Sequence, residues 1–488
     1  MDLNYRAITR TLGDILTITG LLMLLPFVVA VVYHEPVCMR VFLSVGIFTT
    51  AVGIAVLSAV RESAMEMRMR DGFLMVAISW LLVSAVSAVP FVLTGAIPHY
   101  ADAFFESCSG YTTTGATILT DIEVMPRSIL FWRSFAHWIG GMGILVFTIA
   151  LLPEMGIGGQ NIARAETPGP VFSKISARMS DTARFLYLMY AGYTVAETIL
   201  LMLGGMNFYE AIVNTFGTVG TGGFSIWNDS IAHYDSLYVE SVITVFMLLS
   251  GASFNLFFLV VTTGLKAFLQ DSEFKLYLLI YGLSTLLITC GMSVGHGADF
   301  WASLRISSFQ VASLLTTSGF ATSNYVMWPT FCQMILLLLF FVGGCSGSTS
   351  SGVKVIRVLV LIKALRANVR SKLHPNALTN IRVDNRIIPT ETISTITSYL
   401  FLYLGVMFLV GSTLTILDGL NMIDGLSTAA TCLGNVGPAF GEMGPAANFS
   451  GLSVFSKYLL SLTMITGRLE LYTIMLLFSR RFWNPYRY

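Results

Sequence analysis

Four stretches of the chain end in closely spaced threonine, serine, glycine and asparagine residues, which offer many oxygen atoms and no charge. Backbone carbonyls arranged in a ring, helped by hydroxyl groups, are ligands that replace the hydration shell of a monovalent cation. Glycine in such a loop permits positive φ and a close approach of two backbones. We therefore expect these four stretches to supply the ligands of a monovalent cation.

The four stretches recur along the chain. Aligning them superposes Gly115, Gly222, Gly319 and Gly437, which lie 107, 97 and 118 residues apart. These separations are close to one period of about 105 residues and indicate a duplicated unit of helix, half-helix, loop and helix. A half-helix of about ten residues is about 15 Å long and reaches only the middle of a membrane. Non-helical backbone at that depth must be buried in protein or line water, so four such loops around one axis would surround a cation path.

The composition places these loops in a membrane protein. Of 488 residues, 55% are hydrophobic and 11% are charged, whereas a soluble domain carries about 25% charged residues. The net charge of +1 gives no reason to expect nucleic-acid binding. Apolar runs predict ten membrane elements, at 12–33, 41–60, 72–95, 129–152, 184–205, 236–264, 275–295, 331–364, 395–417 and 451–478.

Basic residues decide the orientation of these elements. With the N-terminus in the cytoplasm, 22 Lys and Arg residues fall in cytoplasmic segments and four in outer segments. The positive-inside rule then predicts both termini in the cytoplasm, with the four loops entering from outside. The outer segments hold an excess of acidic residues, which either concentrates cations at the mouth or reflects only the depletion of basic residues there. These acidic residues are Asp102, Glu106, Asp121, Glu123, Glu210, Asp229, Asp235, Asp299, Asp424 and Glu442.

The eighth apolar run is interrupted. Positions 343–352 contain four Gly and five Ser or Thr residues, so a continuous helix is not expected there. Discontinuous helices mark ion paths, and we expect a gate below the third loop, with a structural kink as the alternative. Its residues would be Gly343, Gly344, Cys345, Ser346, Gly347, Ser348 and Thr349. Arg468 lies within the last apolar run, where a charge is costly; we expect it to donate to gate carbonyls, to oppose cations, or to act as a structural tie.

The loops, together with GlyGlyCysSerGlySerThrSerSerGlyValLys (343–354) and GlyArgLeuGluLeuTyr (467–472), resemble the Trk/Ktr/HKT superfamily of potassium transporters, and within it the TrkH-type membrane subunits. The resemblance covers essentially the whole chain, including two additional N-terminal spans. It implies a potassium-channel-like pseudo-tetramer in which the four loops form a selectivity filter. By this resemblance the filter residues would be Thr112, Thr113, Thr114, Gly115, Val219, Gly220, Thr221, Gly222, Thr316, Thr317, Ser318, Gly319, Gly434, Asn435, Val436 and Gly437. Glycine at all four aligned positions accompanies potassium preference in this superfamily, although Asn435 and Val436 depart from the Thr and Ser of the other loops.

The resemblance further implies potassium uptake across a bacterial inner membrane, with rubidium as an analogue, by a protein that is not an enzyme. It implies a homodimer and a cytoplasmic nucleotide-binding regulatory subunit resembling TrkA. No covalently or tightly bound cofactor is expected, only potassium in the filter. The chain has neither a GxGxxG in a βαβ context nor an HExxH motif, so nucleotide control would come from the partner.

We accordingly expect an all-α integral membrane fold with ten membrane elements. Four helix, pore-loop, helix repeats in a pseudo-fourfold arrangement would follow two N-terminal helices. The expected division is 1–71 for the N-terminal addition, 72–152 for repeat 1, 153–265 for repeat 2, 266–365 for repeat 3 with its broken second helix, 366–394 for a cytoplasmic linker and 395–488 for repeat 4.

Two other functions compete with this interpretation. An intramembrane serine protease would use the GxSG pattern of 344–347 and His137, the one histidine inside an apolar run. A symporter coupled to sodium or protons would be built from inverted repeats, whereas these repeats share one orientation. Glu197 and Asn255 either line the path or form interhelical hydrogen bonds, and Lys354 is expected to anchor the cytoplasmic end of the broken helix.

Overall fold

The computed structural model describes residues 3–60, 68–143, 179–375, 380–384 and 386–484, and the chain there is mostly helical. Six helical segments in these ranges are long and apolar enough to cross a bilayer, and a seventh candidate is a bent pair of helices. The six are Tyr5–Val32, Pro36–Ala59, Met69–Leu93, Phe185–Leu203, Ser272–Gly295 and Thr390–Asp418. The expected element 129–152 is seen only as far as residue 143, and its remainder lies outside the described residues.

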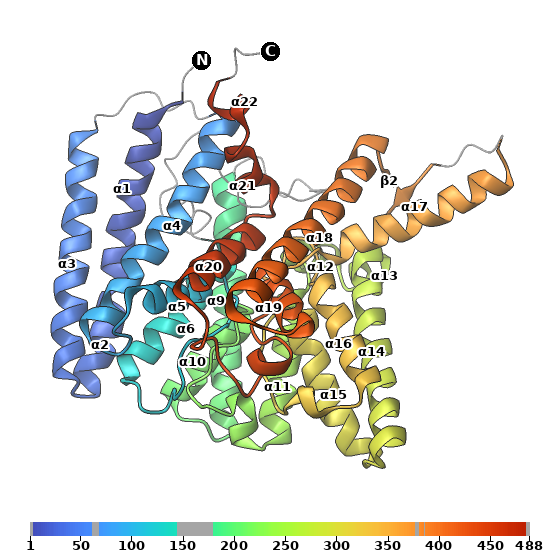
Figure 1. The fold of residues 1–488 in the computed structure, drawn as a ribbon, viewed down its shortest axis with the longest axis horizontal. Helices are drawn as coiled ribbons and strands as arrows, with labels where there is room; N and C mark the ends of the chain where they lie inside the picture. Colours follow the sequence, from blue (N-terminus) through green and yellow to red (C-terminus); the bar gives the residue numbers. More distant parts are fainter. Residues whose placement is uncertain (1–2, 61–67, 144–178, 376–379, 385, 485–488) are drawn as a thin grey trace.

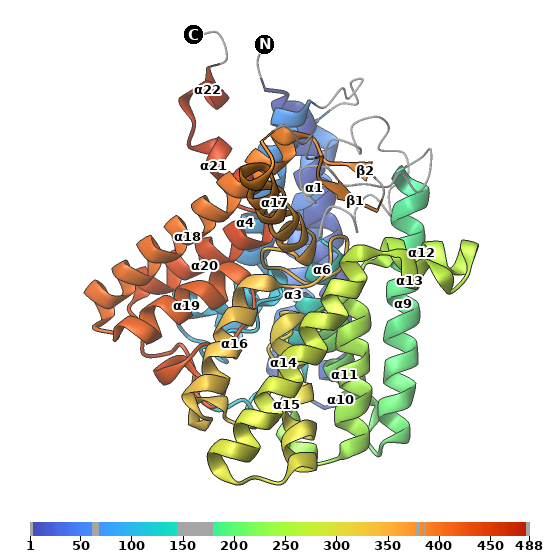
Figure 2. The ribbon, with the colours of Figure 1, turned by 90° about the vertical axis from the view of Figure 1, so that its right-hand side faces the viewer.

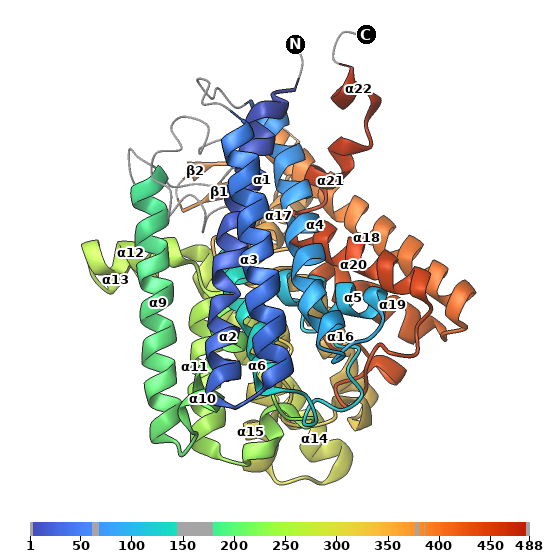
Figure 3. The same cartoon turned by 90° about the vertical axis from the view of Figure 1, so that its left-hand side faces the viewer.

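Three N-terminal helices form one side of the bundle (Figures 1 and 3). They are α1 (Tyr5–Leu22), α2 (Leu24–Val32) and α3 (Pro36–Ala59). Helices α1 and α3 lie close together because small residues face each other. A Cβ added at Gly20 would lie 2.6 Å from the backbone nitrogen of Thr50, and one at Gly53 would lie 2.6 Å from that of Thr17. Small residues at such a crossing are typical of helix packing in membranes.

The rest of the chain presents the same order of elements four times: a long helix, a short helix, a loop, and a further helix. The first set is α4 (Met69–Leu93), α5 (Tyr100–Tyr111) and α6 (Arg127–Met142). The second is α9 (Met179–Leu203), α10 (Phe208–Val219), α11 (Leu237–Gly251) and α12 (Phe254–Thr263). The third is α14 (Ser272–His296), α15 (Phe300–Leu315), α16 (Thr330–Val342) and α17 (Val355–Leu373). The fourth is α18 (Thr390–Asp418), α19 (Met422–Gly434), α20 (Val454–Arg468) and α21 (Tyr472–Leu477).

Three of the four short helices begin at a side-chain cap, and a residue with positive φ follows the end of each short helix. The side chains of Asn207, Asp299 and Asn421 accept hydrogen bonds from the first turns of α10, α15 and α19. Such caps satisfy backbone N–H groups that have no partner within the helix. The four short helices contain 12, 12, 16 and 13 residues, so each is too short to cross a bilayer that needs about 20 residues.

The remaining elements are short. They comprise η1 (Ser230–Tyr234), α13 (Lys266–Gln270), η2 (Tyr325–Met327), β1 (Arg382–Val383), β2 (Arg386–Ile387), η3 (Gly441–Met443) and α22 (Arg480–Trp483). The antiparallel pair β1–β2 lies between α17 and α18, and Val383 joins a small apolar cluster with Val360 and Ile396. Helices α12 and α13 project sideways from the end of α11 (Figure 2).

Two helices that the sequence predicted as continuous are broken. The expected element 236–264 bends by 93° between α11 and α12. The carbonyls of Ser250 and Gly251 at this bend accept hydrogen bonds from another segment, residues 343–354, instead of continuing the helix. The expected element 451–478 ends at Arg468, and Glu470 and Leu471 take positive φ values of 54° and 45° before α21 begins. Positive φ for such residues is an outlier that marks strain or function.

The outer faces of the long helices are apolar and exposed. Large exposed side chains include Ile47, Phe48 and Ile54 on α3, Leu283 and Leu286 on α14, and Phe401, Phe408 and Leu409 on α18. A water-soluble protein seldom exposes apolar surface on this scale. Together with the long apolar helices, these faces identify a membrane protein whose surface contacts lipid.

Candidate functional site

The four short helices lead into loops with one shared backbone pattern. We call residues 112–115, 220–223, 316–319 and 434–437 the ring loops. The second residue of each ring loop has a positive φ, at Thr113 (53°), Thr221 (54°), Thr317 (55°) and Asn435 (52°). The fourth residue is a glycine with positive φ, at Gly115 (80°), Gly223 (78°), Gly319 (78°) and Gly437 (109°).

This pattern corrects the sequence alignment in the second loop. The sequence superposed 219–222 on the other loops, with Gly222 opposite Gly115. Thr221 has the positive φ of the second position, and Gly223, not Gly222, has that of the fourth, so Val219 precedes the loop. Two adjacent glycines satisfied the sequence pattern equally well, and only the backbone conformation separates them. The ring loop is therefore 220–223.

The ring loops pack against each other in a closed cycle. Each fourth-position glycine lies against the carbonyl oxygen of the third residue of the next loop. A Cβ added to the glycine would lie 2.0 Å from that oxygen for Gly115 and Gly222, 2.0 Å for Gly223 and Ser318, 2.3 Å for Gly319 and Val436, and 2.6 Å for Gly437 and Thr114. The last pair returns to the first loop, so the four carbonyls are held around one closed ring that leaves no room for a side chain.

Hydroxyl groups divide the ring loops into two kinds. In the first loop, the hydroxyls of Thr112 and Thr114 lie 2.8 Å apart. In the third loop, those of Thr316 and Ser318 also lie 2.8 Å apart. The corresponding residues of the second and fourth loops are Gly220 and Gly222, and Gly434 and Val436, which have no hydroxyl. Loops that face each other across the cycle are therefore alike, and neighbours differ.

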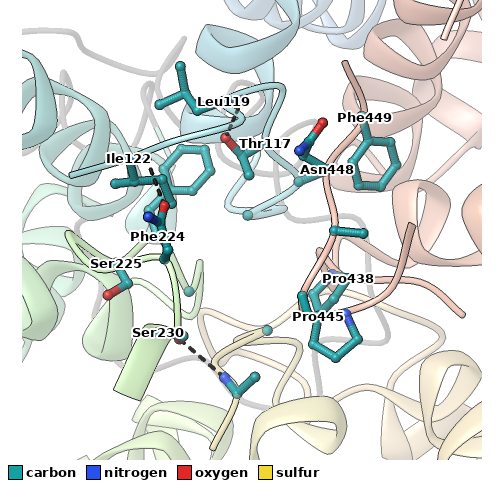
Figure 4. A pocket seen from close by; sticks show the side chains of 18 of the residues that line it. Thr117, Leu119, Ile122, Phe224, Ser225, Ser230, Pro438, Pro445, Asn448 and Phe449 are labelled. Atoms are coloured by element: carbon teal, nitrogen blue, oxygen red, sulfur yellow. Dashed lines mark hydrogen bonds between the residues drawn. The ribbon is translucent and has the colours of Figure 1, made fainter. Parts of the chain in front are cut away.

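A cavity of about 120 Å³ lies beyond the glycine ends of the ring loops (Figure 4). Residues from all four loop regions line it, including Gly115, Phe224, Gly319 and Pro438. The lining also includes Asn448 and Phe449, and the backbone N–H of Phe449 donates to the carbonyl of Thr117 at 2.8 Å. The cavity therefore gives access to the ring from one side.

The acidic residues that were expected to concentrate cations do not line this cavity in the described part of the chain. Glu106 is fully buried and forms an ion pair of 2.5 Å with Arg133, which does border the cavity. Asp102 pairs with Lys457 at 2.6 Å. The sequence showed the excess of acidic residues but not their individual partners, and its two explanations, a mouth that concentrates cations or a depletion of basic residues, both remain predictions.

The ion pair of Glu106 and Arg133 contacts the segments that follow the first and second ring loops. Glu106 accepts hydrogen bonds from the hydroxyl of Thr117 and the N–H of Ile118, both at 2.9 Å, just after the first ring loop. The Arg133 guanidinium donates to the carbonyl of Ser225 at 3.2 Å, after the second ring loop, and lies 3.8 Å from the centre of the Phe224 ring. The pair thus joins the exits of two neighbouring loops.

His137 makes a second brace between the same two loops. One ring nitrogen lies 2.7 Å from the carbonyl oxygen of Gly110, and the other accepts the N–H of Phe224 at 3.3 Å. A Cβ added at Gly222 would lie 2.3 Å from the His137 ring. Backbone groups engage both ring nitrogens, and among the described contacts His137 forms no hydrogen bond with Ser346, so these contacts give no support to a serine protease.

The predicted interruption of the eighth element is present as a loop between α16 and α17. We call residues 343–354 the intramembrane loop. Its backbone leaves the helix at Gly343, with φ of 70°, and rejoins one after Lys354, with φ of 73°. The Nζ of Lys354 donates to the carbonyl of Ser350 within the same loop. Lys354 therefore fastens the loop itself as well as marking its end.

The intramembrane loop packs into the bend between α11 and α12. The N–H of Cys345 donates to the carbonyl of Gly251 at 2.8 Å, and both the N–H and the hydroxyl of Thr349 point to the carbonyl of Ser250, at 3.3 and 3.1 Å. In return, the N–H of Phe254 donates to the carbonyl of Gly347 at 3.0 Å. These bonds explain the bend between α11 and α12, because the last carbonyls of α11 accept hydrogen bonds from the intramembrane loop instead of from a continuing helix.

Glu273, near the start of α14, holds both ends of the intramembrane loop. One of its carboxylate oxygens accepts the N–H of Ser346 at 2.6 Å and the N–H of Ile356 at 3.1 Å. Its side chain is buried, so no water competes for these two donors. The sequence analysis did not select Glu273, and the signal available was a carboxylate at the edge of an apolar run.

Arg468 connects the intramembrane loop to the end of α6. Its guanidinium donates to the carbonyl of Thr349 at 2.8 Å and to the hydroxyl of Ser351 at 3.1 Å. It also donates to the carbonyls of Gly140 and Gly141, at 2.5 and 2.7 Å. The bond to Thr349 matches the expectation that Arg468 donates to carbonyls of this loop.

The break after Arg468 gives Glu470 a separate partner. The carboxylate of Glu470 pairs with Arg357 on α17. The Arg357 guanidinium also lies 4.1 Å from the centre of the Tyr399 ring on α18. The end of α20 is thus attached to both sides of the intramembrane loop, through Arg468 and through Glu470.

Glu197 and Asn255, which the sequence analysis placed either along the path or in interhelical contacts, lie in different surroundings. Glu197 is fully buried on α9, and neither carboxylate oxygen has a hydrogen-bond partner among the described residues. Asn255 lies beside the intramembrane loop, because a Cβ added at Gly347 would lie 3.3 Å from its side-chain amide. Asn255 therefore borders the loop, while Glu197 lies within the helix packing.

Comparison with known proteins agrees with this geometry. A family model described as a cation transport protein, TrkH, matches residues 39–292 and 300–484. The chain is 35% identical to the Trk system potassium uptake protein TrkH of Escherichia coli over 99% of this chain and 100% of the relative. It is 36% identical to the Trk system potassium uptake protein TrkG of the same organism, with 99% of both chains covered.

The fold agrees as well. The crystal structure of the potassium transporter TrkH from Vibrio parahaemolyticus superposes with a TM-score of 0.89 at 31% identity, covering 99% of this chain and all of that one. These relatives are transport proteins and not enzymes. The family model and the full-length relatives together show that the chain belongs to the TrkH family of cation transport proteins.

Proposed function

We propose that this protein takes up potassium through a selectivity filter built from the four ring loops. The carbonyls of Thr114, Gly222, Ser318 and Val436 would be the principal ligands, since they are fixed by the glycines of the neighbouring loops. Rings of backbone carbonyls suit dehydrated monovalent cations. The relatives named above are potassium uptake proteins, which supports potassium as the cation. No tightly bound cofactor is needed for this function.

The observation that carries the proposal is the closed cycle of glycine and carbonyl contacts. Four unrelated turns would not be expected to repeat the same contact, between a fourth-position glycine and a third-position carbonyl, from each loop to the next and from the fourth loop to the first. The cycle also supports a pseudo-fourfold arrangement of four helix, pore-loop, helix repeats, with ion ligands at 112–115, 220–223, 316–319 and 434–437. The fourth ring loop differs because the amide of Asn435 donates to the hydroxyl of Thr114 at 2.9 Å.

The intramembrane loop is the proposed gate. It separates α16 from α17 and lies near the end of the third ring loop that follows α15, on the side away from the cavity. Arg468, Glu273 and the α11–α12 bend hold it in place. Gly343, Gly344, Gly347 and their serine and threonine neighbours allow it to change conformation. Movement of this loop would open the path that it blocks when closed.

We further propose a bacterial inner-membrane location with both ends of the chain in the cytoplasm. The beginning of α1 and helix α22 lie at the same end of the bundle (Figure 1), and the basic segments favour that end as the inner one. The proposed division remains an N-terminal pair of spans, of which Tyr5–Val32 is one, four repeats and the linker 366–394, into which α17 extends as far as Leu373. A cytoplasmic nucleotide-binding subunit resembling TrkA and a homodimer complete the proposal.

The test is rubidium uptake into proteoliposomes, with sodium as competitor, by the wild-type protein and by Gly319→Ser. The added side chain would displace the carbonyl of Val436, so we expect uptake to lose its preference for rubidium over sodium. Gly405→Ser is the matched control, because a Cβ at Gly405 meets nothing within 4 Å. A Gly319→Ser protein with wild-type preference, in the same preparation, would remove the third ring loop from the filter and refute the proposal.

A further inference from the structure

We propose that the hydroxyl of Thr317 couples the intramembrane loop to the ring loops, by accepting a hydrogen bond from that loop when it is closed and turning to the ion path when it opens. The inference rests on the proposed function and adds a residue that belongs to both of its parts. The observation behind it is one buried hydrogen bond, from the backbone N–H of Ser351 to the Thr317 hydroxyl oxygen, at 2.9 Å.

The second positions of the ring loops provide an internal comparison. Thr113, Thr221, Thr317 and Asn435 share one backbone conformation, and all four side chains are fully buried. The Thr113 hydroxyl has no hydrogen-bond partner among the described residues. Thr221 donates to the carbonyl of Gly220 in its own loop at 2.7 Å. Of these four side chains, only Thr317 bonds the intramembrane loop in the part of the chain described.

The amide side chain of Asn435 completes the comparison. It donates to the Thr114 hydroxyl and to the carbonyl of Met464 on α20, both at 2.9 Å. Asn435 therefore ties the fourth ring loop to the first loop and to a neighbouring helix. The side chains at these four equivalent backbone positions therefore have different hydrogen-bond partners. In the third loop, the partner of Thr317 is the intramembrane loop, the segment proposed to move.

Ser351, within the intramembrane loop, is bonded both to Arg468 and to the third ring loop. Its hydroxyl accepts from Arg468 at 3.1 Å while its N–H donates to Thr317. The same region is closely packed, since a Cβ added at Gly251 in the α11–α12 bend would lie 2.7 Å from the methyl group of Thr316. A displacement of the intramembrane loop therefore has to break or move the bond to Thr317.

The released hydroxyl would need a new partner. A buried polar group without one is destabilising, and the nearest new partner in a hydrated open path is water or the permeating cation. A threonine hydroxyl can serve as a cation ligand through its oxygen lone pairs. Thr317 would therefore add an oxygen ligand at the inner end of the filter only in the open state.

The experiment measures how far the closed loop limits uptake. We compare wild type, Thr317→Val, Thr113→Val and Thr221→Val. Each is prepared in two forms, the intact chain and a chain shortened by deletion of residues 346–350, and rubidium uptake into proteoliposomes is measured for both forms. The readout is the ratio of uptake by the intact chain to uptake by the shortened chain of the same variant. Any general effect of a substitution on permeation cancels in this ratio. Thr317→Ser, which keeps the hydroxyl, checks that a change in the valine variant comes from that group.

We expect Thr317→Val to raise this ratio by about fivefold, which corresponds to the loss of one hydrogen bond of about 1 kcal/mol from the closed state. The ratio for Thr113→Val, Thr221→Val and Thr317→Ser should stay at the wild-type value. In the shortened chain, Thr317→Val should also weaken the preference for rubidium over sodium.

Three results would overturn the inference. An unchanged ratio in Thr317→Val, or an equal rise in Thr113→Val, would show that the Ser351 bond does not stabilise the closed loop. Wild-type uptake that is the same with and without residues 346–350 would show that the loop is not a gate. If the ratio is unchanged in Thr317→Val while Gly319→Ser still loses its preference for rubidium over sodium, the filter stands and only the coupling fails; if Gly319→Ser also keeps the wild-type preference, the proposed filter fails too.

Discussion

The carbonyl oxygen of Gly222 lies 2.0 Å from the point where the Cβ of any side chain at Gly115 would have to be. The same relation connects Gly223 to Ser318, Gly319 to Val436 and Gly437 to Thr114. Each glycine therefore acts on the loop that follows it, and a substitution in one loop should be felt by the carbonyl of the next.

The second ring loop tests this relation, because its two adjacent glycines face different neighbours. Gly223→Ala would press on the Ser318 carbonyl and has to adopt a φ of 78°, whereas Gly222→Ala would press on the His137 side chain. We expect both single variants to reduce rubidium preference. Adding His137→Ser should partly restore Gly222→Ala, since contacting residues are not additive, but it should not restore Gly223→Ala.

The measurement is rubidium uptake with sodium competition, alongside thermal unfolding in detergent. Equal rescue of both alanine variants by His137→Ser would contradict the register 220–223. Gly192→Ala serves as the control for the preparation, because a Cβ there meets nothing within 4 Å.

Arg468→Ala should release the intramembrane loop, because four acceptors lose their shared donor. Loss of a hydrogen bond from a charged group costs about 1.5 kcal/mol or more, which corresponds to an increase in rubidium uptake of about tenfold. Arg468→Lys should resemble alanine more than wild type, since one ammonium group cannot span both α6 and the loop. Arg40→Ala, which removes an exposed arginine bonded to Pro36, should leave uptake unchanged. Wild-type uptake in Arg468→Ala would disprove this role.

Glu273→Ala should also favour the open loop, because it leaves the N–H groups of Ser346 and Ile356 without their acceptor. Each unsatisfied buried donor costs about 1–3 kcal/mol, so we expect a rise in uptake of at least about fivefold. Glu273→Gln keeps a side-chain oxygen in place and should have the smaller effect. The control is Glu391→Ala, an exposed residue in the first turn of α18. A glutamine variant as leaky as the alanine variant would show that the negative charge, not the acceptor geometry, holds the loop.

Glu106→Gln and Arg133→Met should each lower the thermal stability of the protein strongly. The two side chains are 0% and 1% exposed, and removing one partner of such a pair leaves a buried charge at a cost of about 3–5 kcal/mol. The double variant should lose less than the sum of the two single variants. Thermal unfolding of the four proteins measures this difference, and strictly additive losses would mean that the pair does not stabilise the loop exits.

Several features were predictable from the sequence because they depend on local composition. The interruption at 343–352 follows from its glycine and serine content, and the short helices follow from apolar segments too brief to span a membrane. The bend between α11 and α12 is different. Its cause is a partner segment almost a hundred residues away in sequence, since Thr349 bonds the carbonyl of Ser250, and no pattern within 236–264 indicates that contact.

The site shows the same division. Arg468 was identified because a charge inside an apolar run is conspicuous, and its bond to Thr349 agrees with the role expected for it. Gly223 was missed because Gly222 gave an equally good alignment. Glu273 was missed because its function comes from two backbone N–H groups brought together only by the fold. The excess of outer acidic residues was found by counting charges, and a count does not reveal that Glu106 is paired with Arg133.

The contact between Ser351 and Thr317 has a consequence for the evolution of such proteins. In an assembly of four identical chains, every change in one pore segment is repeated four times around the axis. Here the four segments belong to one polypeptide, so a substitution in one of them is not repeated in the other three. The third quarter could therefore acquire a tether to the segment proposed to move, while the first kept a threonine without a hydrogen-bond partner among the described residues and the fourth an asparagine. Covalent linkage of the quarters makes it possible for a nearly symmetric pore to be controlled from one side.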